Sequence, residues 1–467
     1  MSLSTPAISP QTDAPLHRYP SRSAVMGWIL FDWAAQPYFT LITVFVFAPY
    51  FASRVAPDPA TGQALWGFAT AAAGLIIAIF SPVLGAIADA SGRRKPWIAA
   101  FGLLLVIGSS MMWLAKPGDT SSIVPVLLAF GVATIGVEFA TVFNNAMMPT
   151  LVPPDRIGRL SGTGWAVGYI GGILSLIVVL GFLAANPDTG RTLFGLVPLF
   201  GLDPAMHEGD RMSGPLTGLW FVIFVLPMFL LTPDYPARNS LKTALRVGLK
   251  DLRATLRSLP SQRSLLIFLI ANMIYTDGLV SLFAFGGIYA AGTFGWNTIQ
   301  IGSFGILLAA AGTLGAWIGG KLDDLLGAKT VIGACLVLLL ATIGLILLID
   351  RDSVFFIPVE PPVRGGPLFS GRAEQAYMVL GFVMGAAAGP LQAASRSLLI
   401  QMAPRDRVTQ YFGLFALTGK VTSFIGPLLI GVVTAVTASQ KAGMAMLLLF
   451  FIAGLALLPL IKPKAAA

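Results

Sequence analysis

The sequence predicts an all-α polytopic membrane protein whose twelve transmembrane helices form two pseudo-symmetric six-helix bundles. The first indication is composition, because 56% of the 467 residues are hydrophobic and only 11% are charged, whereas soluble domains carry about 25% charged residues. The second is a series of apolar stretches of about 20 residues, the length that crosses a bilayer core about 30 Å thick. The third is a pair of loop motifs in the first half that returns in the second.

The expected spans lie six on each side of a polar segment at 233–263. Those of the first bundle, residues 24–232, are 24–50, 64–90, 96–115, 122–150, 159–185 and 216–232. Those of the second bundle, residues 264–461, are 264–291, 297–325, 329–350, 374–402, 408–437 and 441–461. Residues 1–23 are rich in Pro, Ser and Thr and lack an apolar segment, so we expect a disordered tail and no cleavable signal peptide. Residues 462–467 form a second tail.

The distribution of Lys and Arg predicts the orientation of these spans. With the N-terminus inside, the inner segments hold 20 of the 30 basic residues, and such a surplus marks the cytoplasmic side. Both termini are therefore expected in the cytoplasm, and the protein is expected in the inner (plasma) membrane of a bacterium. Because this bias accounts for most of the net charge of +9, no nucleic-acid partner is expected.

The segment 233–263 has the pattern of an amphipathic helix. Leucines recur every three or four residues, at Leu241, Leu245, Leu249, Leu252, Leu256 and Leu259. Basic residues fill the opposite face, at Lys242, Arg246, Lys250, Arg253 and Arg257. This pattern favours a helix lying on the anionic inner leaflet, with membrane lipids as its partners. The alternative is a binding site for a calmodulin-like protein.

Two loop motifs recur between the halves, and their charges are candidates for gating. The segments Gly85–Lys95 and Gly320–Lys329 place two glycines and an aspartate at the same spacing, and Pro-x-Asp-Arg occurs at 153–156 and at 404–407. Opposite charges at helix ends that face the partner half can form contacts in one access state only. The alternative is that they are solvated loop charges. The candidate gating residues are Asp89, Arg93, Arg94, Asp155, Arg156, Asp324, Asp406 and Arg407.

The first of these loops resembles the signature loop of the major facilitator superfamily. Three further stretches resemble the vacuole-effluxer-like family of autophagy-related amino-acid permeases and their bacterial relatives: Phe-Asp-Trp-Ala at 31–34, Gly-Thr-Gly-Trp-Ala-Val-Gly-Tyr at 162–169, and Ser-Arg-Ser-Leu at 395–398. The resemblance implies the major facilitator fold. It also implies that the first, fourth, seventh and tenth spans line a central cavity.

Five charged residues lie inside the expected spans, and they are candidates for coupling and cargo binding. Each would cost roughly 2.5–3.5 kcal/mol at a lipid-facing helix centre, so each should face the protein interior or a watery cavity. We expect at least one of Asp32, Glu138 and Asp277 to take up and release a proton. Arg396 or Lys420 would hold an anionic group of the cargo, since a guanidinium can clasp a carboxylate with two hydrogen bonds. The alternative is that these charges pair internally and pin helices together.

Polar and aromatic side chains near these charges are typical of a small-molecule site. For any one of them, plain helix packing is the alternative. The expected substrate-binding residues are Arg396, Lys420, Asn144, Asn145, Trp33, Tyr38, Tyr169 and Gln392.

Together these features favour a monomeric secondary transporter that is not an enzyme. The cargo class implied by the resemblance is an amino acid or similar metabolite, moved outward and coupled to a proton or another ion. No cofactor or metal is expected, because the two histidines, His17 and His207, lie far apart in loop-like segments. Two alternatives remain open: a lipid or amphiphile transporter with lateral access, and a solute sensor that does not transport.

Overall fold

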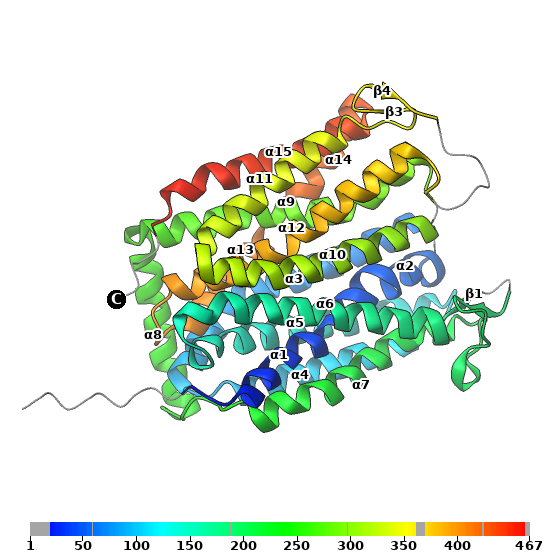
Figure 1. The fold of residues 1–467 in the computed structure, drawn as a ribbon. Coiled ribbons are helices and arrows are strands. Elements are labelled where there is room, and N and C mark those ends of the chain that lie inside the picture. Colours follow the sequence, from blue (N-terminus) through cyan, green and yellow to red (C-terminus); the bar gives the residue numbers. More distant parts are fainter. Residues whose placement is uncertain are drawn as a thin grey trace, which may run out of the picture.

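The computed structural model describes residues 19–57, 59–186, 189–296, 298–360, 369–422 and 425–462. Its long helices run side by side (Figure 1). Helix α8 (Leu241–Ser258) lies across the helix ends on one side, which we call the α8 end. Two short β-hairpins lie on the opposite side, which we call the hairpin end. The predicted tails at 1–23 and 462–467 fall outside the described residues, except for 19–23 and 462.

The first half contains six of the expected spans. Span one is α1 (Arg22–Pro37), followed by π-helical turns at Tyr38–Phe45, α2 (Phe47–Tyr50) and π-helical turns at Phe51–Val55. The other helices are α3 (Pro59–Ser91), α4 (Lys95–Met111), α5 (Ile123–Asn145), α6 (Ile157–Val178, with π-helical turns at Val179–Leu183) and α7 (Glu208–Leu231). Helix α7 begins well before the predicted start at 216. Arg211, expected in a loop, is therefore buried in its first turn.

The second half follows α8. Its helices are α9 (Arg263–Phe294), α10 (Thr298–Leu326), α11 (Ala328–Ile346), α12 (Arg372–Met402), α13 (Val408–Val421), α14 (Ile425–Thr437) and α15 (Gln440–Leu457). The hairpins pair β1 (Ala185–Asn186) with β2 (Arg191–Thr192) and β3 (Ser353–Val354) with β4 (Ile357–Pro358), both antiparallel. Short 3₁₀ turns occur at Met112–Leu114, Thr120–Ser122, Met148–Thr150, Pro154–Arg156, Leu199–Gly201, Leu259–Ser261 and Leu458–Leu460.

Among the described residues, eleven helical segments are long and apolar enough to cross a membrane. The remaining predicted span, 408–437, differs from the continuous helix expected because it is divided into α13 and α14. The backbone of Thr422 (φ −117°, ψ 1°) leaves the α-helical region directly after Val421. An interrupted helix exposes main-chain groups inside the bundle, and transporters commonly use such interruptions as binding sites.

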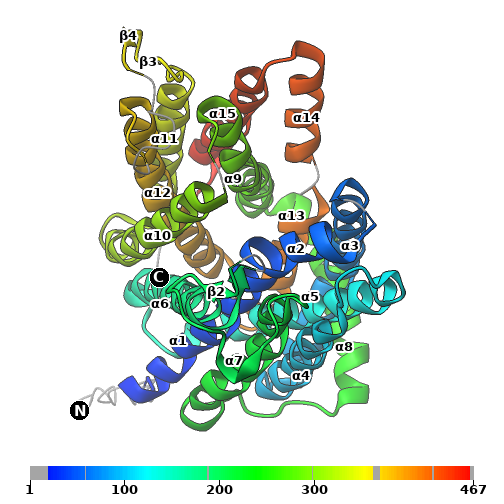
Figure 2. The same cartoon turned by 90° about the vertical axis from the view of Figure 1, so that its right-hand side faces the viewer.

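The two halves form separate groups of helices when seen from the hairpin end (Figure 2). They meet through α6 with α10 and through α3 with α13. At each of these two contacts lies a glycine that follows one of the Pro-x-Asp-Arg motifs. A Cβ atom on Gly162 of α6 would lie 2.3 Å from the carbonyl oxygen of Ala316, and one on Gly413 of α13 would lie 2.4 Å from that of Ser81. The halves therefore touch backbone to backbone at two pseudo-symmetric places.

Candidate functional site

Arg396 of α12 is buried, and its guanidinium reaches three helices of the other half. It donates from Nε to Ser161 Oγ (2.8 Å) and from Nη2 to the Ser161 carbonyl (2.7 Å) on α6. From Nη1 it donates to Asn145 Oδ1 on α5 (2.8 Å) and to Asp32 Oδ2 on α1 (3.3 Å), with which it forms an ion pair. A guanidinium cannot lose its proton in a protein, so this burial depends on the carboxylate and the surrounding acceptors.

Gly164 makes room for this ion pair, and two tryptophans line it. A Cβ atom on Gly164 would lie 2.6 Å from Asp32 Oδ2, so a larger residue would push against the carboxylate. The guanidinium carbon lies 5.5 Å from the ring centroid of Trp28 and 5.9 Å from that of Trp165, within the range of a cation–π contact. Trp28 is held in place because its Nε1 donates to the carbonyl of Asn144 at 2.7 Å.

A second contact between the halves extends this arrangement along α6 and α12. Gln392, one turn before Arg396, donates to the hydroxyl of Tyr169 at 3.3 Å. The Tyr169 ring lies 5.8 Å from that of Trp165. The side chain of Asp32 is 14% exposed and that of Arg396 is 5% exposed, so Asp32 is the more accessible member of the pair. We call the following set the bridging cluster: Asp32, Asn145, Ser161, Trp165, Tyr169, Gln392 and Arg396.

Five residues predicted from the sequence meet in the bridging cluster: Asp32, Asn145, Tyr169, Gln392 and Arg396. Sequence reasoning missed Ser161, which contributes both its hydroxyl and its carbonyl. The only available signal was its position directly before the Gly-Thr-Gly-Trp motif, since small hydroxyl residues are common where membrane helices pack.

Other predicted binding residues lie elsewhere. Trp33 packs against Trp220 of α7, with ring centroids 5.9 Å apart. Tyr38 is fully buried, and its hydroxyl lies 2.6 Å from Thr134 Oγ1 of α5. Both contacts stay within the first half. The side-chain amide of Asn144 is buried, and within the described part of the chain neither its oxygen nor its nitrogen has a hydrogen-bond partner.

Two further predicted charges can be placed by helix only. Glu138 is half-buried on α5, one turn after Thr134. Lys420 is in α13, but its side chain lies outside the described residues.

Asp277 of α9 lies beside the interruption between α13 and α14. It is 2% exposed, and its Oδ1 has no hydrogen-bond partner among the described residues. The side chain of Thr422 lies next to this carboxyl group. At the start of α14, a Cβ atom on Gly426 would lie 3.0 Å from the carbonyl oxygen of Asp277. A buried acid at a helix interruption is suited to take a proton or a cation.

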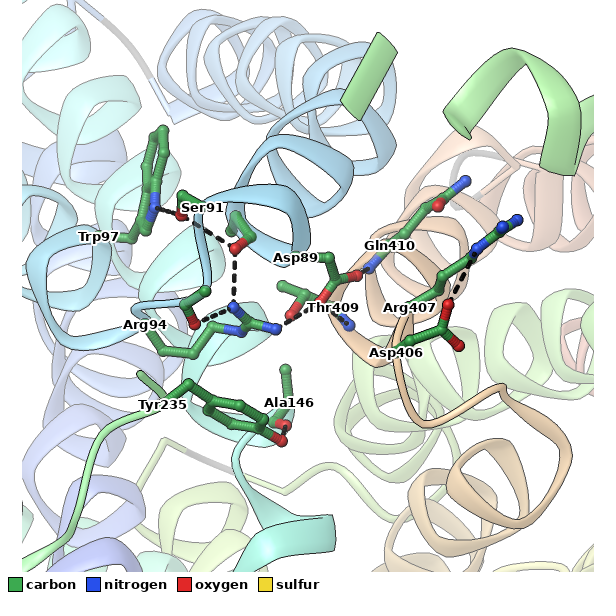
Figure 3. A network of polar contacts seen from close by, with 12 residues as sticks. Asp89, Ser91, Arg94, Trp97, Ala146, Tyr235, Asp406, Arg407, Thr409 and Gln410 are labelled. Atoms are coloured by element: carbon green, nitrogen blue, oxygen red, sulfur yellow. Dashed lines mark hydrogen bonds and ion pairs between the residues drawn. The ribbon is translucent and has the colours of Figure 1, made fainter. Parts of the chain in front are cut away.

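Asp89 of α3 joins the two halves at the α8 end (Figure 3). Its carboxylate accepts from the backbone N–H groups of Thr409 (3.2 Å) and Gln410 (2.8 Å) in the first turn of α13. It also forms an ion pair with Arg94. A carboxylate at a helix N-terminus satisfies free N–H donors and interacts favourably with the helix dipole. We call this contact the α3–α13 clasp.

Residues after α7 support the α3–α13 clasp. Asp234 accepts from the backbone N–H groups of Arg94 (2.8 Å) and Lys95 (3.2 Å), and the Arg94 guanidinium lies 4.6 Å from the ring centroid of Tyr235. Burial raises the pKa of Tyr235, so its phenol stays neutral beside the guanidinium. Gly92 has φ +93°, and a Cβ atom there would lie 2.1 Å from the Pro236 carbonyl. The loop therefore requires glycine at this position.

The second half makes a matching contact, which we call the α10–α6 clasp. Asp324 of α10 accepts from the backbone N–H of Arg159 at 3.0 Å, in the first turn of α6. It also lies 3.4 Å from Arg159 Nε. Its neighbour Asp323, which sequence reasoning missed, is 3% exposed. A Cβ atom on Gly158 would lie 2.5 Å from the Asp323 carboxyl carbon.

The remaining loop charges are exposed. Arg93 is exposed, and the Asp155–Arg156 pair (3.9 Å) has side chains 72% and 65% exposed. Asp406 lies 3.4 Å from Arg407, within the same loop. Exposed ion pairs contribute about 0–1 kcal/mol. Of the eight predicted gating residues, Asp89, Arg94 and Asp324 therefore take part in the clasps, and Arg407 contacts α8 through Thr255 Oγ1 (3.3 Å).

The chain has the fold of the major facilitator superfamily. FucP, a transporter of this superfamily solved in the outward conformation, matches with a TM-score of 0.69 over 95% of this chain and 99% of that chain, at 14% identity. The proton:xylose symporter XylE matches with a TM-score of 0.64 over 95% of each chain, also at 14% identity. Likeness at this identity concerns the fold.

A model of the family described as "Vacuole effluxer Atg22 like" matches residues 20–466, and the chain belongs to that family. The MFS-type transporter YxiO of Bacillus subtilis is 24% identical over 451 residues, which cover 94% of each chain. Autophagy-related protein 22 of Cryptococcus neoformans is 25% identical over 303 residues, or 63% of this chain and 48% of that protein. The chain thus matches about half the length of this fungal relative. The predicted superfamily and family are confirmed, and the chain is an integral membrane transporter, not an enzyme.

Proposed function

We propose that this transporter carries an amino acid or a similar small zwitterion out of the cytoplasm, coupled to protons, by alternating access as a monomer. The observation that carries the proposal is the Asp32–Arg396 ion pair, which joins the halves inside the bundle. In this proposal the α8 end faces the cytoplasm of a bacterial cell, as the Lys and Arg distribution predicts.

The ion pair favours a zwitterionic cargo. Any movement that separates the halves takes Arg396 of α12 away from Asp32, Asn145 and Ser161. Each member of the pair then needs a new partner, because an uncompensated buried charge is costly. An amino acid supplies both partners, since its carboxylate fits the guanidinium fork and its ammonium fits the Asp32 carboxylate. Replacing the internal ion pair with these two contacts to a zwitterion adds no net charge to the site.

Proton coupling is proposed for the buried acids. Asp32 can take a proton after the cargo has left and while Arg396 is held away, because the acid then lacks a cationic partner. Asp277 is a second candidate, because its carboxyl group is buried beside the interruption between α13 and α14. Glu138 is a third. Asn144 and Lys420 remain proposed cargo contacts.

The clasps provide the proposed gate on the cytoplasmic side. The carboxylates of Asp89 and Asp324 each accept a hydrogen bond from the backbone in the first turn of a helix from the opposite half. Opening this side must break both contacts, and re-forming them closes it.

Reconstituted exchange tests the proposal. Proteoliposomes loaded with an amino-acid mixture should exchange at least one labelled amino acid, and Arg396→Ala should abolish that exchange. Arg372→Ala removes the same charge from an exposed position on the same helix, so it should exchange like the parent.

A pH gradient tests proton coupling. When the liposome lumen is more acidic than the outside, the parent should accumulate the amino acid. Neutralising the coupling acid should spare exchange but stop this accumulation. Equal exchange by the parent and Arg396→Ala would refute the assigned role of Arg396. Movement of labelled phospholipid in place of solute would favour the lipid transporter, and solute binding without exchange would favour the sensor.

A further inference from the structure

Helix α8 has a leucine face that the described chain does not cover. Its protein-facing row is Ala244, Gly248, Leu252 and Thr255, all buried, and the helix packs on α3. A separate row carries four leucines between 44% and 66% exposed: Leu241, Leu245, Leu249 and Leu256. The single leucine face read from the sequence is thus divided, because small residues make the protein contact and most of the leucines are left free.

A row of cations borders these leucines. With 3.6 residues per turn, the leucine row lies between the protein-facing row and the basic row. The basic row consists of Lys242, Arg246, Lys250, Arg253 and Arg257, which are all exposed. Among the residues that the structure describes, none of these five cations forms an ion pair. The helix therefore presents an apolar strip edged by positive charge, the pattern of an interfacial helix on anionic lipid.

Helix α8 packs on α3 close to the end of that span. Figure 1 shows the helix lying across the spans and not along them. A Cβ atom on Gly248 would lie 2.8 Å from the carbonyl of Ala86, so the two backbones are in contact. Ala86 is five residues before Ser91, the last residue of α3. This separation corresponds to about 7 Å of helix rise, comparable to the headgroup layer on one side of a bilayer, about 5–7 Å.

Helix α8 also contacts both sides of the α3–α13 clasp. Ala86 lies one turn before Asp89 on α3. On the other side, Arg407, just before α13, donates from Nη1 to Thr255 Oγ1 at 3.3 Å. A helix held in place by lipid would therefore hold the two elements that Asp89 joins.

We propose that α8 binds anionic phospholipid of the adjacent leaflet, and that this binding stabilises the state in which the α3–α13 clasp is closed. The five exposed cations favour anionic headgroups as the occupant over a second copy of this chain, whose own α8 would present the same positive charge. The proposal concerns regulation and does not depend on the identity of the cargo.

A nitroxide at Leu249→Cys, in the full chain with Cys335→Ala, tests the occupant. The protein is placed in nanodiscs of phosphatidylcholine alone or mixed with phosphatidylglycerol. Phosphatidylglycerol should raise collisions of the label with oxygen and lower collisions with a water-soluble nickel chelate. Lys242→Gln/Arg246→Gln/Lys250→Gln should remove this lipid dependence, since each lost cation weakens surface binding about fivefold. The control Lys116→Gln/Arg351→Gln/Arg372→Gln removes three exposed cations outside α8 and should behave like the parent. A label that meets the nickel chelate equally in both lipids, or spin–spin broadening from a second copy, would overturn the proposal.

The labelling rate of Gln410→Cys tests the regulatory part. Gln410 is buried at the α3–α13 clasp, at 1% exposure. Phosphatidylglycerol should slow its reaction with a maleimide several-fold, and the triple α8 variant should react at one fast rate in both lipids. The labelling rate of Gln410→Cys could be the same in both lipids although Leu249→Cys still reports insertion of α8. That result would limit α8 to anchoring and refute the proposed coupling to the clasp.

Discussion

The buried Arg396 joins the two halves of the protein through its hydrogen-bond donors. Its guanidinium has five N–H groups, and four donor contacts reach Asp32, Asn145 and Ser161 in the other half. Removing either member of the Asp32–Arg396 pair should destabilise the protein, because the other charge would remain buried without its partner. This dependence can be measured without knowing the cargo.

Asp32→Ala should lower the free energy of unfolding by about 3–5 kcal/mol, because it leaves the Arg396 guanidinium buried without a carboxylate. The double variant Asp32→Ala/Arg396→Met should recover much of this loss, since it removes the stranded charge as well. Asp155→Ala at the exposed pair is the control and should change stability by about 0–1 kcal/mol. Denaturant unfolding in mixed micelles provides the values. Additive losses in the double variant would mean that the two charges do not interact.

The sequence could predict Arg396 but not its surroundings. A charge inside an apolar span is conspicuous. So is the side-chain amide of Asn145, which lies in another apolar span. Half of the acceptor set, however, is the hydroxyl and backbone carbonyl of Ser161, and a backbone carbonyl has no signature in the sequence. Trp33 illustrates the opposite problem. It adjoins Asp32 in the chain, yet helix geometry turns its ring toward Trp220 of α7.

At the scale of elements, the clasps join helix termini across the two halves. Asp89 and Asp324 occupy corresponding positions in the repeated loops, and each accepts from N–H groups in the first turn of a helix in the other half. Their cations differ in origin. Arg94 comes from the same loop as Asp89, whereas Arg159, which serves Asp324, comes from the opposite half. The second loop lacks paired basic residues, and Arg159 supplies the missing charge.

Asp89→Asn should loosen the α3–α13 clasp without unfolding the protein, because it removes a charge from a contact that exists between the halves. Coupling of this kind amounts to about 1–3 kcal/mol, which corresponds to an increase of roughly 5- to 150-fold in the population of the open state. Maleimide labelling of Gln410→Cys in the Cys335→Ala chain should accelerate accordingly. Asp406→Asn, which alters an exposed pair in the neighbouring loop, should leave the rate unchanged. Equal rates for Asp89→Asn and the parent would reduce Asp89 to a capping residue with no effect on access.

Element boundaries show where sequence reasoning was sufficient. Apolar length located eleven spans, because the bilayer imposes that length on any helix that crosses it. The interruption between α13 and α14 was overlooked, although Pro427 lies within the predicted span and cannot donate a backbone hydrogen bond. The partners of Asp89 could not be predicted, since they are the backbone N–H groups of Thr409 and Gln410.

At the scale of the whole molecule, the two halves are joined in two different ways. Backbone contacts at Gly162 and Gly413 and the two clasps hold the α8 end, whereas the bridging cluster holds the interior through charges. A transporter that exposes its site to alternate sides must break these contacts and form them again. Cargo that occupies Arg396 and Asp32 must therefore change the distance between the halves at the α8 end.

That distance is the most direct measurement. Spin labels at Arg93→Cys and Arg405→Cys, both exposed and on opposite sides of the α3–α13 clasp, report it by double electron–electron resonance in the Cys335→Ala chain. With a saturating amino acid that supports exchange, we expect a second, longer distance population, which Arg396→Ala should lack. A single distribution that is unchanged by a bound and exchanging amino acid would show that cargo at Arg396 and Asp32 does not move the halves at the α8 end.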